Sequence, residues 1–330
     1  MPIRPLRLPE DLLPAADMLM KTFQYPDHPE WGIESDEQEQ LVGMIRRMRR
    51  MWPAIHLVQL FSPALRDFMR SFVWEEGGAI VGMTMAQREG TTSMWYIGTV
   101  GVLPEFRGRS IARQLVQTTL DMIRERGGER VRLGVIDGNT PAQTLYSSLG
   151  LTAYGGSARY ILAPSAPVDR LTLPPGYVEE QLREFDWRTR YELDRRITPA
   201  QRQAFEPITP ARYRMPLLMR TLAIPFHFIE NSRDKDLIIR RSSDRVVVAR
   251  AGWSIVKRGK GMNSIRVRLD PACSDLAPYL VRKALVTVLE KSPDLRIDLL
   301  ALDWAPSVAK EAEALGFVRR TSNRMMGMKL

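Results

Sequence analysis

The sequence resembles itself at a constant offset of 166 residues. The block from Asp137 to Leu151 aligns with the block from Asp303 to Phe317, and each block precedes a short strand-like run. The same offset places Ile80 and Val81 on Val246 and Val247. Single matches of this kind are common by chance, but the shared order of elements indicates a duplication. We therefore expect two copies of one fold.

The first copy alternates strand and helix patterns. Apolar residues recur at helical spacing in 11–23 and 111–123, and a short helix is expected at 140–149. Apolar runs predict strands at 3–8, 71–75, 79–87, 93–102, 130–136 and 159–162. Gly77 and Gly78 favour a hairpin between two of these strands. The predicted fold class is α/β (α+β), with a mixed, mostly antiparallel sheet flanked by helices in each copy.

A proline-rich stretch separates the two copies. Pro164, Pro167, Pro174 and Pro175 lie close together, which predicts a linker at 166–176 between domains at 1–165 and 177–330. A chain of 330 residues is also too long for one ordinary core and suits two domains. The duplication and the linker predict the same division.

Composition excludes several chemistries. One cysteine, Cys273, rules out an internal disulfide, and three scattered histidines lack metal-ligand spacing, so no metal is expected. The formal net charge of +10 fits an anionic ligand. The arginines of the sequence are spread along the chain. Their densest cluster, at 46–50, is interpreted as the solvated face of an amphipathic helix. With no recognised nucleic-acid module, a nucleic-acid partner is not expected.

The chain is expected to be cytoplasmic. The N-terminus does not resemble a secretion signal, and no apolar run approaches the roughly 18 residues that span a bilayer. The nearest candidate, Leu217 to Ile229, is interrupted by Arg220, Pro225 and His227 and is interpreted as a buried segment. We expect no membrane partner, and a homodimer is left open.

The segment from Thr99 to Arg113 carries the most specific signal. A strand ends, a turn containing Gly and Arg follows, and an amphipathic helix begins at once. The N–H groups of a first helical turn have no intrahelical acceptor and lie at the positive end of the helix dipole, which suits a pyrophosphate. Small residues allow close approach to the backbone at Gly108, Ser110 and Ala112. Positive charge comes from Arg107, Arg109 and Arg113.

This stretch resembles the cofactor signature of the GNAT acetyltransferase superfamily, Arg/Gln-x-x-Gly-x-Gly/Ala. Arg107 takes the first position, Ser110 stands where the first Gly is expected, and Ala112 takes the last. Downstream, the run Asn139-x-x-Ala142-x-x-Leu145-Tyr146-x-x-Leu149-Gly150-Leu151 resembles the second conserved block of the superfamily. The resemblance covers residues 3–163, and two spaced motifs in the correct context are more specific than either alone. The chain is identified as a tandem GNAT protein with a degenerate second domain.

Serine at position 110 departs from the superfamily pattern. Serine retains the backbone N–H that would contact a phosphate. In a helical first turn serine is expected to cost little, and it can accept a local hydrogen bond. We therefore expect cofactor binding to survive the departure.

The resemblance implies a role for each motif residue, with acetyl-CoA as co-substrate and no metal. The main chain of Val100, Gly101 and Val102 would pair with the pantetheine arm. The stretch Gly108, Arg109, Ser110, Ile111, Ala112 and Arg113 would hold the pyrophosphate, with Arg107 beside it. Asn139 would bond the cofactor arm and Tyr146 would protonate the departing thiolate. The alternative for Tyr146 is a half-buried aromatic that only packs.

The general base and the acceptor stay open at this point. The strand at 93–102 contains no acid, and Gly134 stands where some superfamily members carry a glutamate. The remaining acids are Asp137, Glu89, Asp27, Glu30, Glu34 and Asp36, and none is assigned. The predicted activity is direct transfer of acetyl to an amine of a small molecule or peptide in a ternary complex, because Cys273 lies outside both motifs. The alternative is a non-catalytic acyl-CoA-binding sensor.

The second copy lacks the residues that carry this chemistry. Ala305 stands where Asn139 is expected and Ala312 where Tyr146 is expected. The run from Leu269 to Asp275 replaces the turn that bears Gly and Arg, and Pro278 removes an N–H from the following helix. We expect one acetyl-CoA per chain, bound by the first copy.

Overall fold

The computed structural model describes residues 2–25, 28–32, 35–61, 67, 69–164, 168–183, 185–214, 232–257, 259 and 261–330. The first half contains β1 (Ile3–Pro5), α1 (Leu12–Thr22), the 3₁₀ helix η1 (Pro29–Trp31), α2 (Ser35–Phe61), β2 (Arg70–Glu76), β3 (Ala79–Arg88), β4 (Met94–Val102), η2 (Pro104–Phe106), α4 (Ile111–Glu125), β5 (Arg130–Ile136), α5 (Thr140–Ser148) and β6 (Thr152–Leu162).

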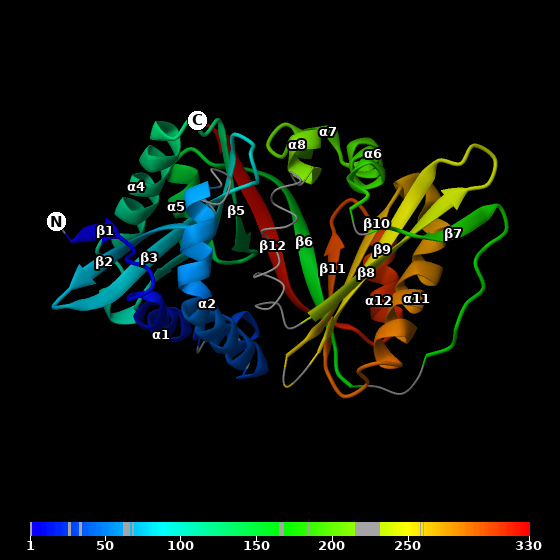
Figure 1. Cartoon of the computed structure of the whole chain (residues 1–330), viewed down its shortest axis with the longest axis horizontal. Helices are drawn as coiled ribbons and strands as arrows, with labels where there is room; N and C mark the ends of the chain where they lie inside the picture. Colours follow the sequence, from blue (N-terminus) through cyan, green and yellow to red (C-terminus); the bar gives the residue numbers. More distant parts are fainter. Residues whose placement is uncertain are drawn as a thin grey trace.

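The second half repeats this order. It contains β7 (Tyr177–Gln181), α6 (Trp187–Ile197), α7 (Ala200–Gln203), α8 (Pro210–Tyr213), β8 (Ser232–Arg241), β9 (Val247–Val256), β10 (Asn263–Leu269), η3 (Pro271–Leu276), α11 (Ala277–Leu289), β11 (Ile297–Leu302), α12 (Pro306–Ala314) and β12 (Val318–Lys329). The helices α5 and α12 begin at Thr140 and Pro306, which are 306 − 140 = 166 residues apart. The predicted duplication is thus present in the fold, as Figure 1 shows.

The strands that the structure describes form one twelve-stranded sheet with the order β1-β2-β3-β4-β5-β12-β6-β11-β10-β9-β8-β7. Among these strands, the pairs β4–β5 and β10–β11 are parallel and the other pairs are antiparallel. The sheet is therefore mixed and mostly antiparallel, and helices flank it in both halves, so the predicted fold class is confirmed (Figure 1).

The last strand of each half pairs with the other half. Strand β12 pairs with β5 over Asn323–Lys329, and β6 pairs with β11 from Ser157 to Leu162. The sequence pattern predicted only 159–162 of this strand, whereas β6 spans Thr152–Leu162 and pairs with β11 and β12. A division of the chain at residues 165 and 177 therefore separates two stretches of sequence, while each half of the sheet contains a strand from the other stretch.

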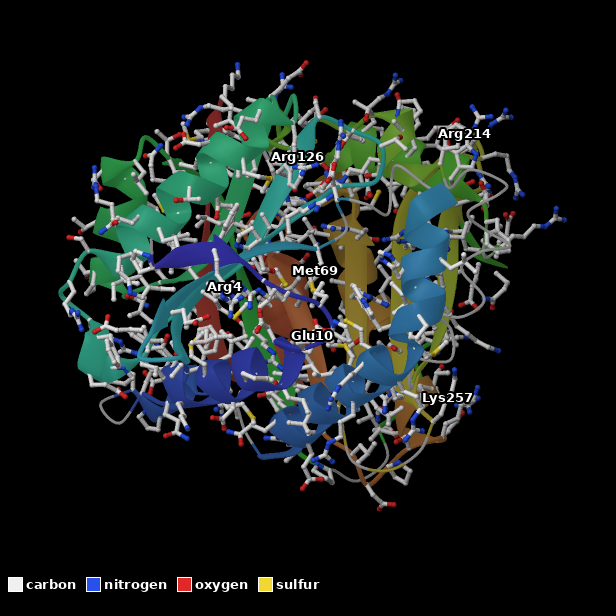
Figure 2. All side chains as sticks on the ribbon, turned by 60° about the vertical axis from the view of Figure 1, so that its left-hand side comes forward. Arg4, Glu10, Met69, Arg126, Arg214 and Lys257 are labelled. Atoms are coloured by element: carbon white, nitrogen blue, oxygen red, sulfur yellow. The ribbon has the colours of Figure 1, made fainter. Side chains whose placement is uncertain are left out.

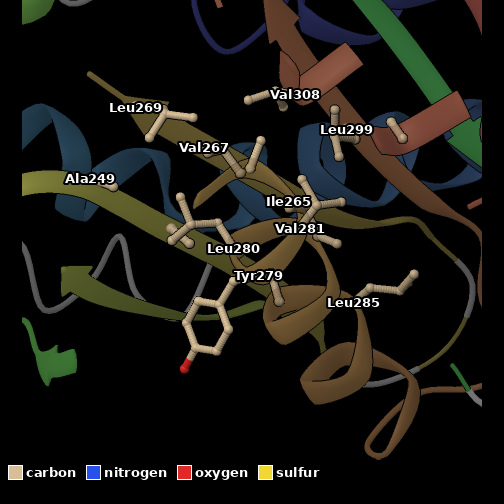
Figure 3. Close-up of a cluster of buried hydrophobic side chains, with 14 of the residues drawn as sticks. Ala249, Ile265, Val267, Leu269, Tyr279, Leu280, Val281, Leu285, Leu299 and Val308 are labelled. Carbon is tan, nitrogen blue, oxygen red and sulfur yellow. The ribbon is translucent and has the colours of Figure 1, made fainter. Parts of the chain in front are cut away.

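The apolar faces of α4 and α11 pack into the cores of the first and second halves. Helix α4 buries Ile111, Leu115, Val116, Leu120 and Ile123, the stripe that the helical spacing predicts. In the second half, Leu280, Val281 and Leu285 of α11 pack against β9, β10 and β11 (Figure 3). Each large apolar side chain buried in this way contributes about 1.5–3 kcal/mol.

Two expectations concerned apolar segments: a buried segment at Leu217 to Ile229 and the lack of a membrane-spanning run. The segment Leu217 to Ile229 lies outside the described residues. Within them, no helix combines the length and apolar character that a membrane crossing requires. Charged side chains surround both halves, including Arg126 in the first half and Lys257 in the second (Figure 2).

Candidate active site

A β-bulge opens the sheet between β4 and β5. Opposite β3, the pairing shifts between Thr99 and Ile97, so Gly98 is an extra residue in β4. The parallel pairing of β4 with β5 covers Met94 to Ile97 and stops at the bulge. Beyond it, the edge of β4 that faces β5 keeps backbone N–H and C=O groups without a strand partner, so this edge can accept an extended ligand arm.

A cavity of about 800 Å³ lies beside this open edge. Residues of α1, η1, β4, α4, α5 and their connecting turns line it. The structure brings together here all predicted site residues except Arg109, namely Val100, Gly101, Val102, Arg107, Gly108, Ser110, Ile111, Ala112, Arg113, Asn139 and Tyr146. Its volume falls in the range of pockets that enclose small molecules and cofactors.

The turn before α4 is tighter than the sequence suggested. Gly108 has a φ of 76°, and no atom lies within 4 Å of the position where a Cβ would be. Ser110, the residue that caps α4, has a φ of 57° and a ψ of 13°, which is the left-handed region, and its side chain makes no capping hydrogen bond. The expectation of a serine in a helical first turn with a local hydrogen bond was therefore wrong.

The first turn of α4 offers free donors to the cavity. Its hydrogen-bonding begins with the Gln114 N–H, which donates to the Ser110 carbonyl at 3.1 Å. The N–H groups of Ile111, Ala112 and Arg113 precede that bond and have no intrahelical acceptor. These groups and the left-handed turn at Ser110 form the concave surface that suits a phosphate.

The three arginines have different positions. Arg107 donates to the carbonyls of Val102 at 3.2 Å and Thr22 at 3.0 Å, so it ties the end of β4 to α1. Arg113 donates to Ser148 Oγ at 2.7 Å and joins α4 to α5 across the cavity. Arg109 is placed outside the cavity, where it forms an ion pair with Glu76 at 3.0 Å.

Helix α5 positions the other two predicted residues. The Asn139 side chain accepts a hydrogen bond from the Ala142 N–H at 3.2 Å and caps the helix. Tyr146, 7% exposed, packs in the first-half core and also lines the cavity. Burial, followed by the neighbouring Tyr25 and Tyr96, raises the pKa of Tyr146. The phenol therefore stays protonated well above neutral pH.

Sequence reasoning missed an aromatic group above the cavity. Tyr25, His28 and Trp31 line it, from the connection between α1 and α2. The His28 and Trp31 rings are stacked with centroids 3.9 Å apart, and Tyr25 meets Trp31 edge to face at 5.6 Å. The sequence feature that could have indicated this group is the presence of three aromatic or imidazole rings within seven residues of a polar connection.

None of the described acids considered as a base lines this cavity. Glu89 accepts from Arg132 Nε at 2.6 Å and lies 3.3 Å from Arg212, in a cluster that also contains Glu206. Asp137 pairs with Arg324 at 2.9 Å, and Glu30 lies 3.2 Å from His28 Nδ1. Asp27 and Glu34 lie outside the described residues, as does the side chain of Asp36.

In the second half, the residues at the positions of Asn139 and Tyr146 are small and buried. Ala305 and Ala312 are buried in the same core cluster as Leu269 and Leu276. Figure 3 shows Leu269 and Val308 within this cluster. Trp304 stands at the position of Gly138, and the guanidinium carbons of Arg202 and Arg268 lie 4.7 and 5.8 Å from the centroid of its ring.

The fold is that of tandem GNAT proteins. A family model described as "Acetyltransferase (GNAT) family" matches residues 43–151. Over 99% of this chain and 98% of the other, the fold is similar to "Tandem GNAT protein from the clavulanic acid biosynthesis pathway (without AcCoA)", with 15% identity and a TM-score of 0.62.

Two curated relatives align with part of the chain. N-alpha-acetyltransferase 30 of Schizosaccharomyces pombe is 32% identical over 95 residues, which are 28% of this chain and 63% of that protein. Mycothiol acetyltransferase of Thermobispora bispora is 33% identical over 141 residues, 41% of this chain and 42% of that protein. In both cases the chain spans less than two thirds of the length of the relative.

Proposed function

We propose that this protein is an N-acetyltransferase that moves the acetyl group of acetyl-CoA directly to an amine of a small molecule or peptide. The observation that carries the proposal is the shared cavity: the phosphate-type turn, the open edge of β4 and the Tyr146 phenol all line it. A pyrophosphate site beside an unpaired strand edge fits a ligand with a charged end and an extended amide arm.

The chain supplies binding groups along the whole donor. The first-turn N–H groups of α4 and the Arg113 guanidinium would hold the pyrophosphate. The edge of Val100–Val102 would pair with the amides of the pantetheine arm, and the Asn139 amide would bond the same arm. Acetyl-CoA, when bound there, supplies the thioester that is cleaved.

Tyr146 would donate its proton to the sulfur as the thioester breaks. The raised pKa of Tyr146 keeps the phenol in the donor state at neutral pH. A raised pKa also makes the phenol a weaker acid than an ordinary tyrosine. Burial, however, raises the pKa of any group that becomes an anion, including the thiol formed beside Tyr146, so the two pKa values move in the same direction.

The electrostatics of the cavity favour an acceptor amine that loses its proton easily. A lysine-type amine with a pKa of about 10.4 costs about 4.6 kcal/mol to neutralise at pH 7, whereas an α-amine with a pKa of about 7.8 costs about 1 kcal/mol. The described lining residues include no carboxylate that would hold a cation. We therefore favour an α-amine or another amine of low pKa, a class that includes the acceptor named in N-alpha-acetyltransferase 30.

Two measurements test the proposal. The first is calorimetry, which should detect binding of acetyl-CoA. The second follows the release of free CoA thiol with three acceptors: a lysine-free peptide with a free α-amine, the same peptide with a blocked N-terminus and one added lysine, and spermidine. We expect turnover of the first peptide above the other two. Binding without turnover of any acceptor would instead support the acyl-CoA-binding sensor.

A further inference from the structure

Among the described residues that line the cavity, one side chain is of a type that accepts a proton near neutral pH. Among the described lining residues, the titratable groups are Tyr25, His28, Arg107, Arg113 and Tyr146. Arginine stays protonated in proteins. Burial raises the pKa of both Tyr25 and Tyr146, so their phenolates are scarce at neutral pH. Imidazole is the side-chain type that exchanges protons in this pH range, which leaves His28.

The His28 ring is held in a defined orientation. Its Nδ1 lies 3.2 Å from Glu30 Oε1, and a carboxylate can only accept, so Nδ1 carries the proton and donates it. Nε2 is then the basic nitrogen. The ring lies against Trp31 with an angle of 12° between the planes, and the backbone N–H of Trp31 donates to the His28 carbonyl at 2.9 Å.

Contacts from other elements fix this segment over the cavity. The His28 N–H donates to the Tyr25 carbonyl at 3.1 Å, which ties η1 to the end of α1. Trp31 Cζ2 lies 3.5 Å from the position that a Cβ on Gly138 would occupy, so η1 reaches the turn before α5. From the second half, Arg320 donates to the Gly32 carbonyl at 3.3 Å.

We propose that His28 is the general base of the acetyl transfer and that Glu30 is its positioning residue. The proposal rests on the proposed function. The nitrogen lone pair of the neutral acceptor amine forms the C–N bond to the acetyl carbonyl carbon, and the proton of that nitrogen passes to His28 Nε2. The C–S bond breaks with its electron pair on sulfur, which takes the Tyr146 proton. The proton on His28 then returns to Tyr146 through solvent.

The test uses full-length variants and the α-amine peptide as acceptor. His28→Gln should lower kcat by about 10²-fold or more, with the Kd of acetyl-CoA unchanged within about twofold. His56→Gln is the matched control, because His56 is exposed on α2 and lies outside the cavity, and its activity should equal that of the unmodified protein. Glu30→Gln should reduce kcat by a smaller factor.

Rescue separates a base from a structural histidine. In His28→Gly, added imidazole should restore turnover in proportion to the concentration of its free base. Activity of His28→Gln equal to that of the unmodified protein, or no rescue of an inactive His28→Gly that still binds acetyl-CoA, would overturn the role of His28 alone. If the unmodified protein acetylates no amine in the panel, the proposed function is wrong, and the role of His28 as its base is wrong as well.

Discussion

The left-handed backbone at Ser110 makes a quantitative prediction for three substitutions. For a residue with a Cβ, the left-handed region costs about 1–2 kcal/mol, and glycine has no such cost. Glycine also adds about 0.4–1 kcal/mol of unfolded-chain entropy. Ser110→Gly should therefore raise the free energy of unfolding by about 1 kcal/mol. Ser110→Ala should change it by less than about 0.5 kcal/mol, because the serine side chain makes no capping bond.

The same position tests the phosphate site. Ser110→Glu would place a carboxylate beside the first turn of α4, and like unit charges about 5 Å apart repel by about 3 kcal/mol at an effective dielectric constant of 20. The Kd of acetyl-CoA should rise about 150-fold, whereas Ser110→Gly should leave it within about threefold.

Urea unfolding and calorimetry on the same four proteins measure both effects. A loss of 1 kcal/mol or more in Ser110→Gly would refute the left-handed argument. Equal acetyl-CoA affinity in Ser110→Glu would remove this turn from the site.

Three further predictions concern the rest of the molecule. Tyr146→Phe should lower kcat about 10²-fold with little change in acetyl-CoA affinity, because the ring still packs; an equal kcat would leave Tyr146 a purely structural role. Acetyl-CoA should saturate at one equivalent per chain in calorimetry, because Ala305 and Ala312 replace Asn139 and Tyr146 in the second half; two equivalents would show that the second half binds it as well. Glu206→Gln should lower the free energy of unfolding at pH 7 by about 3 kcal/mol, since it breaks a buried ion cluster. Burial raises the pKa of Glu206, but Arg132 and Arg202 hold it below its usual value, so the difference in urea stability between the two proteins should shrink as the pH falls below about 4.5.

Local patterns in the sequence predicted most of the elements around the site. The helix that begins at Ile111 and the strand Arg130–Ile136 follow from apolar spacing, which depends only on the period of each element. The phosphate-type turn could also be located, because a strand, a short turn and a helix are adjacent in the chain. The sign of φ at Ser110 was not predicted, because the direction of a tight turn depends on how β4 and α4 pack together.

The aromatic segment with His28 could not be placed from its sequence. Its position over the cavity depends on Trp31 meeting Gly138 and on Arg320 reaching Gly32, contacts between residues that are far apart in the chain. A polar connection between two helices has no periodic signal, so the sequence showed its composition and not its place.

The duplication was determined by the sequence alone, because a repeat of 166 residues with the same order of elements folds the same way twice. Only the tertiary structure decided that β12 lies between β5 and β6. Alternation along a strand determines which face is apolar, but the backbone hydrogen bonds of one strand are chemically the same as those of another. Which strand becomes the neighbour of β5 is decided by side-chain packing across the completed sheet.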